Sequence, residues 1–411
     1  MFLSKLRNKK EVISWSLYDF ANQPFTTIIV TFVYGAFFTS VIASDENTGT
    51  LLWTWGIAST AIIVSILSPI LGALADKGGY RKFFLILFTW ICAIFSILLY
   101  FPQSGDVFFA LSLFVIANIS FELGSVFCNS YLQDLSEDSN IGKISGFAWG
   151  LGFVGGLLAL FISLSLFELN SVGIRGINIL VGVWFLIFSI PTFIFVKDRK
   201  KDKLTKKHFV DSFVSIKTTF KEVVKYKIIM KFLIARLFFN DGLITIFALG
   251  GIYAVDTLDF TFDEVMMLGI ILNVSASIGS FIFGYLEDKI GVKRVINISL
   301  IVLVFSTLLA FIAPYFTFQK EIFWVAGVLI GLMVGPNQSC SRSLMAKLTP
   351  KEKQNEFFGF FALTGKATSF LGPILFGIIT FNFSQQVALW VVIFLFLIGL
   401  ILFNKINFQD E

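Results

Sequence analysis

One eleven-residue sequence occurs twice in this chain. Residues 72–82 read GALADKGGYRK, and residues 284–294, which lie 212 positions later, read GYLEDKIGVKR. The register also holds upstream, because Ser65 and Ser68 match Ser277 and Ser280. Each copy follows a long apolar stretch and contains a basic turn. A repeat that spans half the chain predicts two similar helical bundles around a central site.

The composition and the length of the apolar segments favour a membrane protein. Of 411 residues, 56% are hydrophobic and 14% are charged, whereas a soluble domain carries about 25% charged residues. Twelve apolar segments are long enough to cross a bilayer, which takes about 20 residues. They are 14–43, 50–75, 83–101, 107–130, 142–166, 174–196, 231–255, 264–286, 294–314, 322–343, 356–380 and 385–404.

We therefore predict an all-α membrane protein with twelve transmembrane helices in two pseudo-symmetric six-helix bundles. The bundles comprise residues 1–196 and 231–411, and residues 197–230 form a basic cytoplasmic linker between them. The linker begins with a charged run, and apolar residues then recur at helical spacing over 209–223, with lysines on another face at positions 217, 221 and 225. This pattern fits an amphipathic helix on an anionic membrane surface or a basic linker that fixes topology.

The distribution of basic residues predicts the orientation. With a cytoplasmic N-terminus, 28 of the 32 Lys and Arg residues lie on the cytoplasmic side and two lie outside, Arg175 and Lys320. Arg236 and Lys366 fall within the membrane. Because cytoplasmic loops carry the excess of basic residues, we expect a cell-membrane protein, inner membrane where there are two, with both termini and both copies of the repeat in the cytoplasm. No cleavable signal peptide is evident, because the first apolar segment is too long.

The sequence gives little sign of a metal, a cofactor or a nucleic acid partner. Cys92, Cys128 and Cys340 lie far apart in apolar segments, as small packing residues do. The only histidine is His208, within the linker. A Gly-x4-Gly-Lys-Ser/Thr phosphate loop is missing, which argues against direct ATP drive. We expect a monomer in the bilayer whose partner is a small-molecule solute.

Four stretches of sequence carry a family resemblance. The repeated loop resembles the signature loop of the major facilitator superfamily. Three further stretches are similar to the vacuole-effluxer-like branch, whose fungal namesake exports amino acids from the vacuole. They are WSLYDFANQPF at 15–25, ANISFE at 117–122 with FCNSYL at 127–132, and QSCSRS at 338–343 followed by EFFG at 356–359, TGK at 364–366 and GP at 372–373.

The resemblance implies that the repeated loops act as cytoplasmic gates. A glycine in each copy lets two helices approach closely, and the acidic and basic residues form a cluster that latches the halves when the cytoplasmic mouth is closed. The alternative is a loop that only fixes topology. The expected gate residues are Gly72, Asp76, Arg81 and Lys82 in the first copy and Gly284, Asp288, Lys293 and Arg294 in the second. Arg342 is expected to be an interfacial anchor or a gate residue.

Ionisable residues within the membrane are costly, and each one is a functional hypothesis. Polar faces occur on the first, fourth, seventh and eleventh segments. Pro24 is expected to bend the first segment and to free a backbone carbonyl as an acceptor, and Gly242 allows a local break in the seventh. The candidate solute-binding or proton-coupling residues are Asp19, Asn22, Gln23, Glu122, Asn129, Arg236, Asn240, Asp241 and Lys366.

These residues favour a secondary transporter over an enzyme. Arg236 or Lys366 suits a carboxylate, and Asp19 or Glu122 suits an ammonium group, so we expect a zwitterionic solute such as an amino acid in one central cavity. The same charges could instead pair with one another and pin helices together. Other solute classes, a lipid-modifying enzyme using Asp134, Glu137 and Asp138 near Ser136, and a non-transporting sensor are the alternatives. A raised carboxylate pKa would permit proton coupling.

Overall fold

The computed structural model describes residues 6, 8–43, 46–167, 170–198 and 225–408. Within these ranges, twelve helical spans are long and apolar enough to cross a membrane, as predicted. Residues 209–224, most of the predicted amphipathic helix, and His208 lie outside the described residues.

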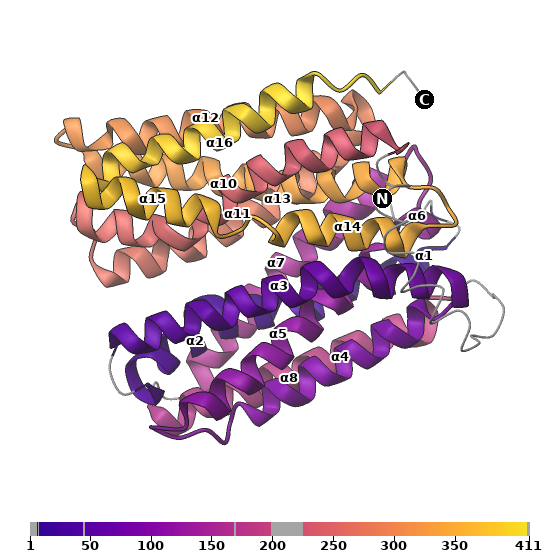
Figure 1. The fold of residues 1–411 in the computed structure, drawn as a ribbon, viewed down its shortest axis with the longest axis horizontal. Coiled ribbons are helices and arrows are strands. Elements are labelled where there is room, and N and C mark those ends of the chain that lie inside the picture. The colour runs from indigo at the N-terminus through magenta and orange to yellow at the C-terminus, as the bar shows by residue number, and fades with distance from the viewer. Residues whose placement is uncertain (1–5, 7, 44–45, 168–169, 199–224, 409–411) are drawn as a thin grey trace. The chain divides into compact units, whose positions relative to one another are not determined.

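The first six spans (Figure 1) begin with α1 (Lys9–Pro24), which continues through η2 (Phe25–Phe32), α2 (Tyr34–Phe37) and η3 (Phe38–Ile42). The others are α3 (Glu46–Gly78), α4 (Arg81–Leu98), α5 (Val107–Asn129) with α6 (Leu132–Leu135), α7 (Ile141–Leu166) and α8 (Ser171–Phe195). The last six are α10 (Lys227–Leu258), α11 (Phe262–Ile290), α12 (Val292–Ile312) with η4 (Ala313–Tyr315), α13 (Gln319–Leu348), α14 (Gln354–Lys366) with α15 (Leu371–Asn382), and α16 (Gln385–Asn404).

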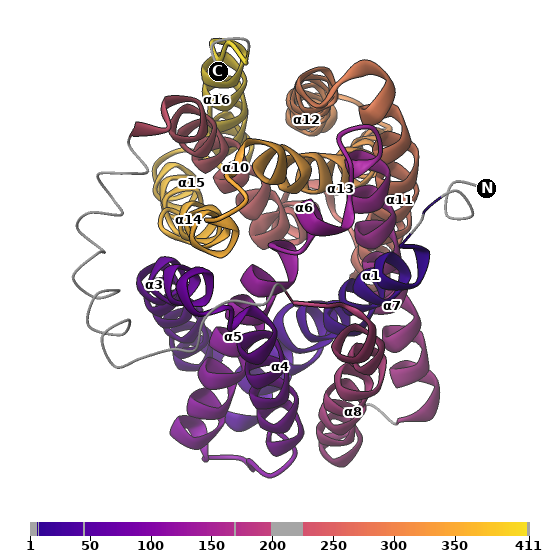
Figure 2. The same ribbon diagram turned by 90° about the vertical axis from the view of Figure 1, so that its right-hand side faces the viewer.

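The chain forms two compact units that each include a segment from the other half of the sequence. Unit 1 comprises residues 1–135, 151–214 and 351–362, and unit 2 comprises residues 136–150, 215–350 and 363–411. The start of α14 therefore packs with α3 in unit 1, and the start of α7 packs with α11 in unit 2. Figure 2 shows most helices of each unit end-on. The division at residues 196 and 231 stays a prediction.

Helix 1 changes its geometry at Pro24. The α-helix ends there, and a π-helix follows from Phe25 to Phe32. Because proline has no N–H, the carbonyl four residues earlier loses its helical donor. That carbonyl belongs to Phe20, and the indole N–H of Trp184 in α8 donates to it at 3.2 Å. The freed acceptor that the sequence predicts is thus bonded within unit 1.

Two predicted helix details are corrected. The break near Gly242 does not occur, because α10 is one continuous helix of 32 residues. Span 11 was predicted as a single segment but is interrupted between Lys366 and Leu371. Figure 1 shows α14 and α15 as separate ribbons joined by a short turn.

Candidate functional site

The first copy of the repeat holds the start of α14. The Asp76 carboxylate accepts the backbone N–H of Glu356 at 2.8 Å and that of Asn355 at 3.2 Å. The Asn355 side-chain amide donates to the same carboxylate at 2.7 Å. The first N–H groups of a helix have no partner within the helix, and they carry partial positive charge. Asp76 on α3 therefore caps a helix that lies 279 residues away in sequence.

The second copy of the repeat does the same for α7. The Asp288 carboxylate accepts the backbone N–H of Gly142 at 2.9 Å and that of Lys143 at 3.1 Å. The ammonium group of Lys143 also lies 3.3 Å from Asp288, whose side chain is 1% exposed. Two aspartates 212 positions apart thus accept N–H groups from helix starts that are 213 positions apart, Gly142 and Asn355.

The glycine of each copy permits these close approaches. A Cβ atom at Gly72 would overlap the backbone carbonyl of Asn355, and one at Gly284 would lie 2.8 Å from the Cα of Gly146. The opposing helices also present glycine, because a Cβ at Gly359 would lie 2.7 Å from the Cα of Pro69. Small residues at both sides of a crossing let helix backbones touch.

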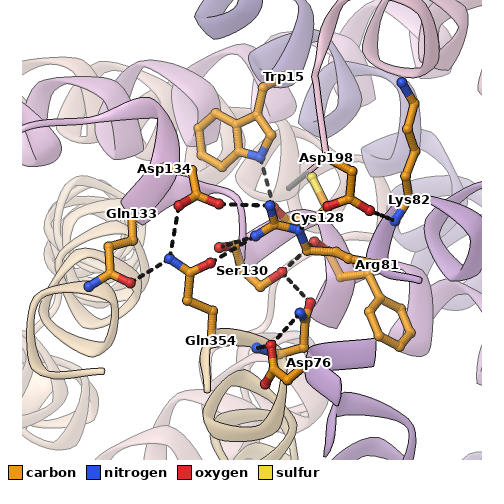
Figure 3. A network of polar contacts seen from close by, with 12 residues as sticks. Trp15, Asp76, Arg81, Lys82, Cys128, Ser130, Gln133, Asp134, Asp198 and Gln354 are labelled. Carbon is orange, nitrogen blue, oxygen red and sulfur yellow. Dashed lines mark hydrogen bonds and ion pairs between the residues drawn. The ribbon is translucent and has the colours of Figure 1, made fainter. Parts of the chain in front are cut away.

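Arg81 is the centre of a buried polar network in unit 1 (Figure 3). Its guanidinium donates to the Asp134 carboxylate at 2.7 Å, the Asp198 carboxylate at 3.3 Å and the Gln354 side-chain oxygen at 2.9 Å. It also lies 3.6 Å from the ring centre of Tyr131. Asp134, considered as part of a catalytic cluster in the enzyme alternative, is a partner of this arginine.

Lys82 ties the end of α8 to the same network. Its ammonium donates to the Val196 carbonyl at 2.8 Å, and its backbone N–H donates to the Asp198 carboxylate at 3.0 Å. A cation beside the last carbonyls of a helix is favourably placed. In the second copy, Lys293 has this role instead, because its ammonium donates to the carbonyls of Asn404, the last residue of α16, and Ile406, two residues further on.

The cations of the second copy do not reproduce the Arg81 network. Arg294 is exposed, and besides the contact of Lys143 with Asp288, this copy contains an ion pair between the buried Glu287 and the half-buried Lys347, at 3.4 Å. Sequence reasoning missed Glu287, which occupies the register position of Ala75 and is 1% exposed. The difference between Ala75 and Glu287 could have identified this residue, because an acidic side chain replaces a small apolar one in a membrane-spanning helix.

Arg342 lies inside unit 2. Its guanidinium donates to the hydroxyl of Ser145 at 3.0 Å and to the Ser145 carbonyl at 2.8 Å, and the side chain is fully buried. The Ser145 hydroxyl in turn donates to the Ser339 carbonyl. Arg342 thus joins α13 to the start of α7 from a buried position, and its role as an anchor or a gate residue stays a prediction.

The candidate solute residues of unit 1 lie on α1 and α5. Asn22 is buried, whereas the others are half-buried, namely Asp19, Gln23, Glu122 and Asn129. Glycines of α7 lie against the α1 residues: a Cβ at Gly152 would be 3.3 Å from the Asp19 carbonyl, and one at Gly156 would be 3.0 Å from Gln23 Cγ. The α1 polar face is therefore packed tightly against a glycine surface.

The candidate solute residues of unit 2 gather around the interruption between α14 and α15. Arg236, Asn240 and Asp241 on α10 are buried, and Lys366 at the end of α14 is half-buried. Asn240 accepts a hydrogen bond from Gln338 of α13 at 3.1 Å. Gln338 belongs to the QSCSRS stretch at 338–343 and is not among the predicted site residues. Whether the candidates of the two units line one cavity stays a prediction.

Comparison with a solved structure supports the class of protein. The chain shares a TM-score of 0.73 with the proton:xylose symporter XylE of the major facilitator superfamily, at 14% identity, over 97% of this chain and 95% of that one. The fold of the described residues is the major facilitator fold.

Comparison of sequences identifies the family within this class. It belongs to the vacuole effluxer Atg22-like family, whose model matches residues 48–410. It is 28% identical to the uncharacterized MFS-type transporter YxiO of Bacillus subtilis, over 96% of this chain and 94% of that protein. It is 22% identical to autophagy-related protein 22 of Coccidioides immitis, over 84% of this chain and 70% of that protein. The chain is a multi-pass membrane transporter of a small molecule and not an enzyme.

Proposed function

We propose that the protein is a secondary active transporter that moves an amino acid across the cell membrane by alternating access. The observation that carries this proposal is the pair of equivalent caps, in which Asp76 holds the start of α14 and Asp288 holds the start of α7. A carboxylate that holds a helix end through a few hydrogen bonds forms a reversible contact. Two such contacts, repeated in the two halves of the sequence, suit a gate that opens and closes in every cycle.

The amino-acid assignment rests on the charges of the candidate residues. Arg236 or Lys366 would hold the carboxylate group of the solute, Arg236 through two parallel hydrogen bonds. Asp19 or Glu122 would hold its ammonium group. Ionisable side chains in membrane spans are costly to keep and line solute or ion pathways. A zwitterion would pair with both the cationic and the acidic candidate residues, whereas an uncharged sugar would pair with neither.

The proposed topology places both termini and both gate loops in the cytoplasm. It follows from the excess of basic residues on that side, 28 against two. We further propose that the protein acts as a monomer and that solute movement is coupled to protons. The proton gradient would then supply the energy for transport.

A binding screen followed by a transport assay tests the proposed function. Purified protein is screened by thermal shift against amino acids, small peptides, organic acids and sugars, and hits are tested by counterflow in proteoliposomes. We expect amino acids to raise the unfolding temperature and to exchange across the bilayer. Stabilisation and exchange with sugars or organic acids alone would replace the solute class. Binding without exchange would favour a sensor.

A further inference from the structure

Span 11 is a discontinuous helix. The backbone N–H of Ser369 turns to the Lys366 carbonyl at 3.3 Å, and that of Leu371 turns to the Thr368 carbonyl at 2.8 Å, so the α-helical ladder is interrupted. Pro373 is the third residue of α15 and has no N–H. A proline lacks the N–H that a continuous helix would use, and its ring crowds the carbonyl four residues earlier, so it favours an interruption before it. The interruption therefore leaves one helix C-terminus and one helix N-terminus within the span.

Helix α10 supplies a partner of the right polarity to each of these ends. The Asn240 side-chain amide donates to the Gly365 carbonyl at 3.2 Å, near the negative end of α14. The Arg236 guanidinium lies beside the same glycine, since a Cβ there would be 3.1 Å from one of its nitrogens. At the positive end of α15, the Asp241 Oδ2 accepts the Gly372 N–H at 3.2 Å. Each contact matches the helix dipole.

Asp241 retains an unused acceptor. The residue as a whole is 2% exposed. Its Oδ1 has no hydrogen-bond partner within the ranges that the structure describes. The buried hydroxyl of Thr245 donates to the Asp241 carbonyl at 2.7 Å and occupies the place that a Cβ of Gly372 would take. A buried carboxylate oxygen without a donor is costly, so this position is suited to a ligand that offers positive charge.

Few other charges face Asp241. The described residues of α15 and α16 carry no charged side chain. Its own helix contributes Arg236, which lies at Gly365, and α14 contributes Lys366 next to that glycine. On α13, the residue bonded to this part of α10 is Gln338, through Asn240. The cations of α13 are bonded elsewhere, namely Lys320 to Glu264, Arg342 to Ser145 and Lys347 to Glu287.

We propose that Asp241, together with Thr245, binds the monovalent cation whose movement is coupled to that of the solute, namely the proton proposed above or Na⁺ in its place. The inference rests on the proposed transport function. A carboxylate neutralised by a bound cation accepts a weaker hydrogen bond and interacts less with a helix dipole. Cation binding at Oδ1 therefore loosens the hold of Asp241 on the Gly372 N–H and on the start of α15. Occupancy of the site is thereby linked to the position of the second half of span 11.

The test compares the cation responses of the wild-type protein and Asp241→Asn without any solute. Unfolding temperatures are measured in NaCl and in choline chloride at equal ionic strength, each over a series of pH values. A ligand that binds only the folded state raises its stability. If the cation is Na⁺, NaCl stabilises the wild type over choline chloride. If it is a proton, the two salts give the same pH profile. In Asp241→Asn, the stabilisation by NaCl or the pH dependence of the unfolding temperature, whichever the wild type shows, is lost.

Two further variants make the result decisive. Asp256→Asn is the matched control, because Asp256 lies on the same helix, is exposed and accepts a hydrogen bond from Gln385; it should keep the wild-type response. Thr245→Val keeps the carboxylate and should weaken the response at least tenfold in cation concentration, which serves if Asp241→Asn does not fold. An unchanged response in Asp241→Asn or Thr245→Val overturns the proposal. Because no solute is used, that failure is separate from a failure to transport amino acids.

Discussion

The Asp76 carboxylate accepts the backbone N–H of Glu356 at 2.8 Å, across 280 residues of sequence. The equivalent bond in the second copy joins Asp288 to the N–H of Gly142 at 2.9 Å. The repeat is thus a repeat of contacts as well as of residues, because the two helix starts that are held are also equivalent. We expect any change that separates either pair to act on the gate rather than on the transmembrane helices themselves.

Substitution of the two crossing glycines should destabilise the protein. In Gly72→Ala and Gly284→Ala, the new methyl group meets backbone atoms of the opposing helix, which cannot move aside as a side chain can. Overpacking of this kind costs roughly 1–3 kcal/mol. Gly377→Ala on α15 is the control, since a Cβ there meets no atom within 4 Å. Thermal unfolding in detergent is the measurement, and equal stability of all three variants would rule out close crossings.

Loss of Arg81 should cost more than loss of Lys293. Arg81 is 3% exposed and its guanidinium bonds to two carboxylates, so Arg81→Gln leaves Asp134 without its cation, at a cost of about 3–5 kcal/mol. Lys293 donates to two carbonyls at a helix end, and Lys293→Gln should cost about 1 kcal/mol. Unfolding midpoints check both values. Asp134→Asn should recover part of the Arg81→Gln loss; similar losses in the two single variants would refute the asymmetry.

Removing the indole donor should expose the effect of Pro24. Trp184→Phe keeps the aromatic contact with Phe20 but leaves the carbonyl of that residue without its donor, which costs about 1 kcal/mol or more. Pro24→Ala restores a backbone N–H. In a double-mutant cycle, Trp184→Phe should therefore cost less in the Pro24→Ala background. Additive losses would show that the indole and the proline are independent.

Neutralising the candidate solute residues should weaken amino-acid binding without unfolding the protein. Arg236→Gln and Lys366→Gln each leave a solute carboxylate unpaired, at about 2–5 kcal/mol, or roughly 30- to 5,000-fold in affinity. Asp19→Asn and Glu122→Gln should weaken binding or abolish its pH dependence. Arg175→Gln, on the predicted outer side, is the control. Ligand-induced thermal shifts measure each change, and wild-type shifts in all four variants would remove the site assignment.

The architecture was predictable from the sequence because transmembrane helices appear as long apolar segments and the two bundles appear as a repeat. Twelve apolar segments and an exact register between Asp76 and Asp288 require no knowledge of tertiary contacts. The helices that these aspartates hold were not predicted, because the capped N–H groups belong to the backbone of remote segments. A backbone donor carries no signature in the side chains around it.

The interruption of span 11 also could not be read from the sequence. Pro69, Pro191 and Pro336 all lie inside continuous helices, whereas the helix is interrupted before Pro373. The difference lies in the neighbours, because Asp241 accepts the N–H of Gly372 that the interruption leaves without a helical partner. Glu287 was overlooked for a related reason: it replaces Ala75 in the repeat, and its role depends on Lys347 of another helix.

The most direct test of the gate is a distance measurement by electron–electron double resonance. Nitroxide labels at Lys77→Cys and Glu352→Cys flank the contact of Asp76 with α14, and both positions are exposed. The three native cysteines are buried, so labelling is selective. We predict that Asp76→Asn adds a longer-distance population, as the cytoplasmic side opens, whereas Asp106→Asn, which removes an exposed carboxylate bonded to Gln103, leaves the distribution unchanged. Superimposable distributions in the wild type and Asp76→Asn would contradict the gating role.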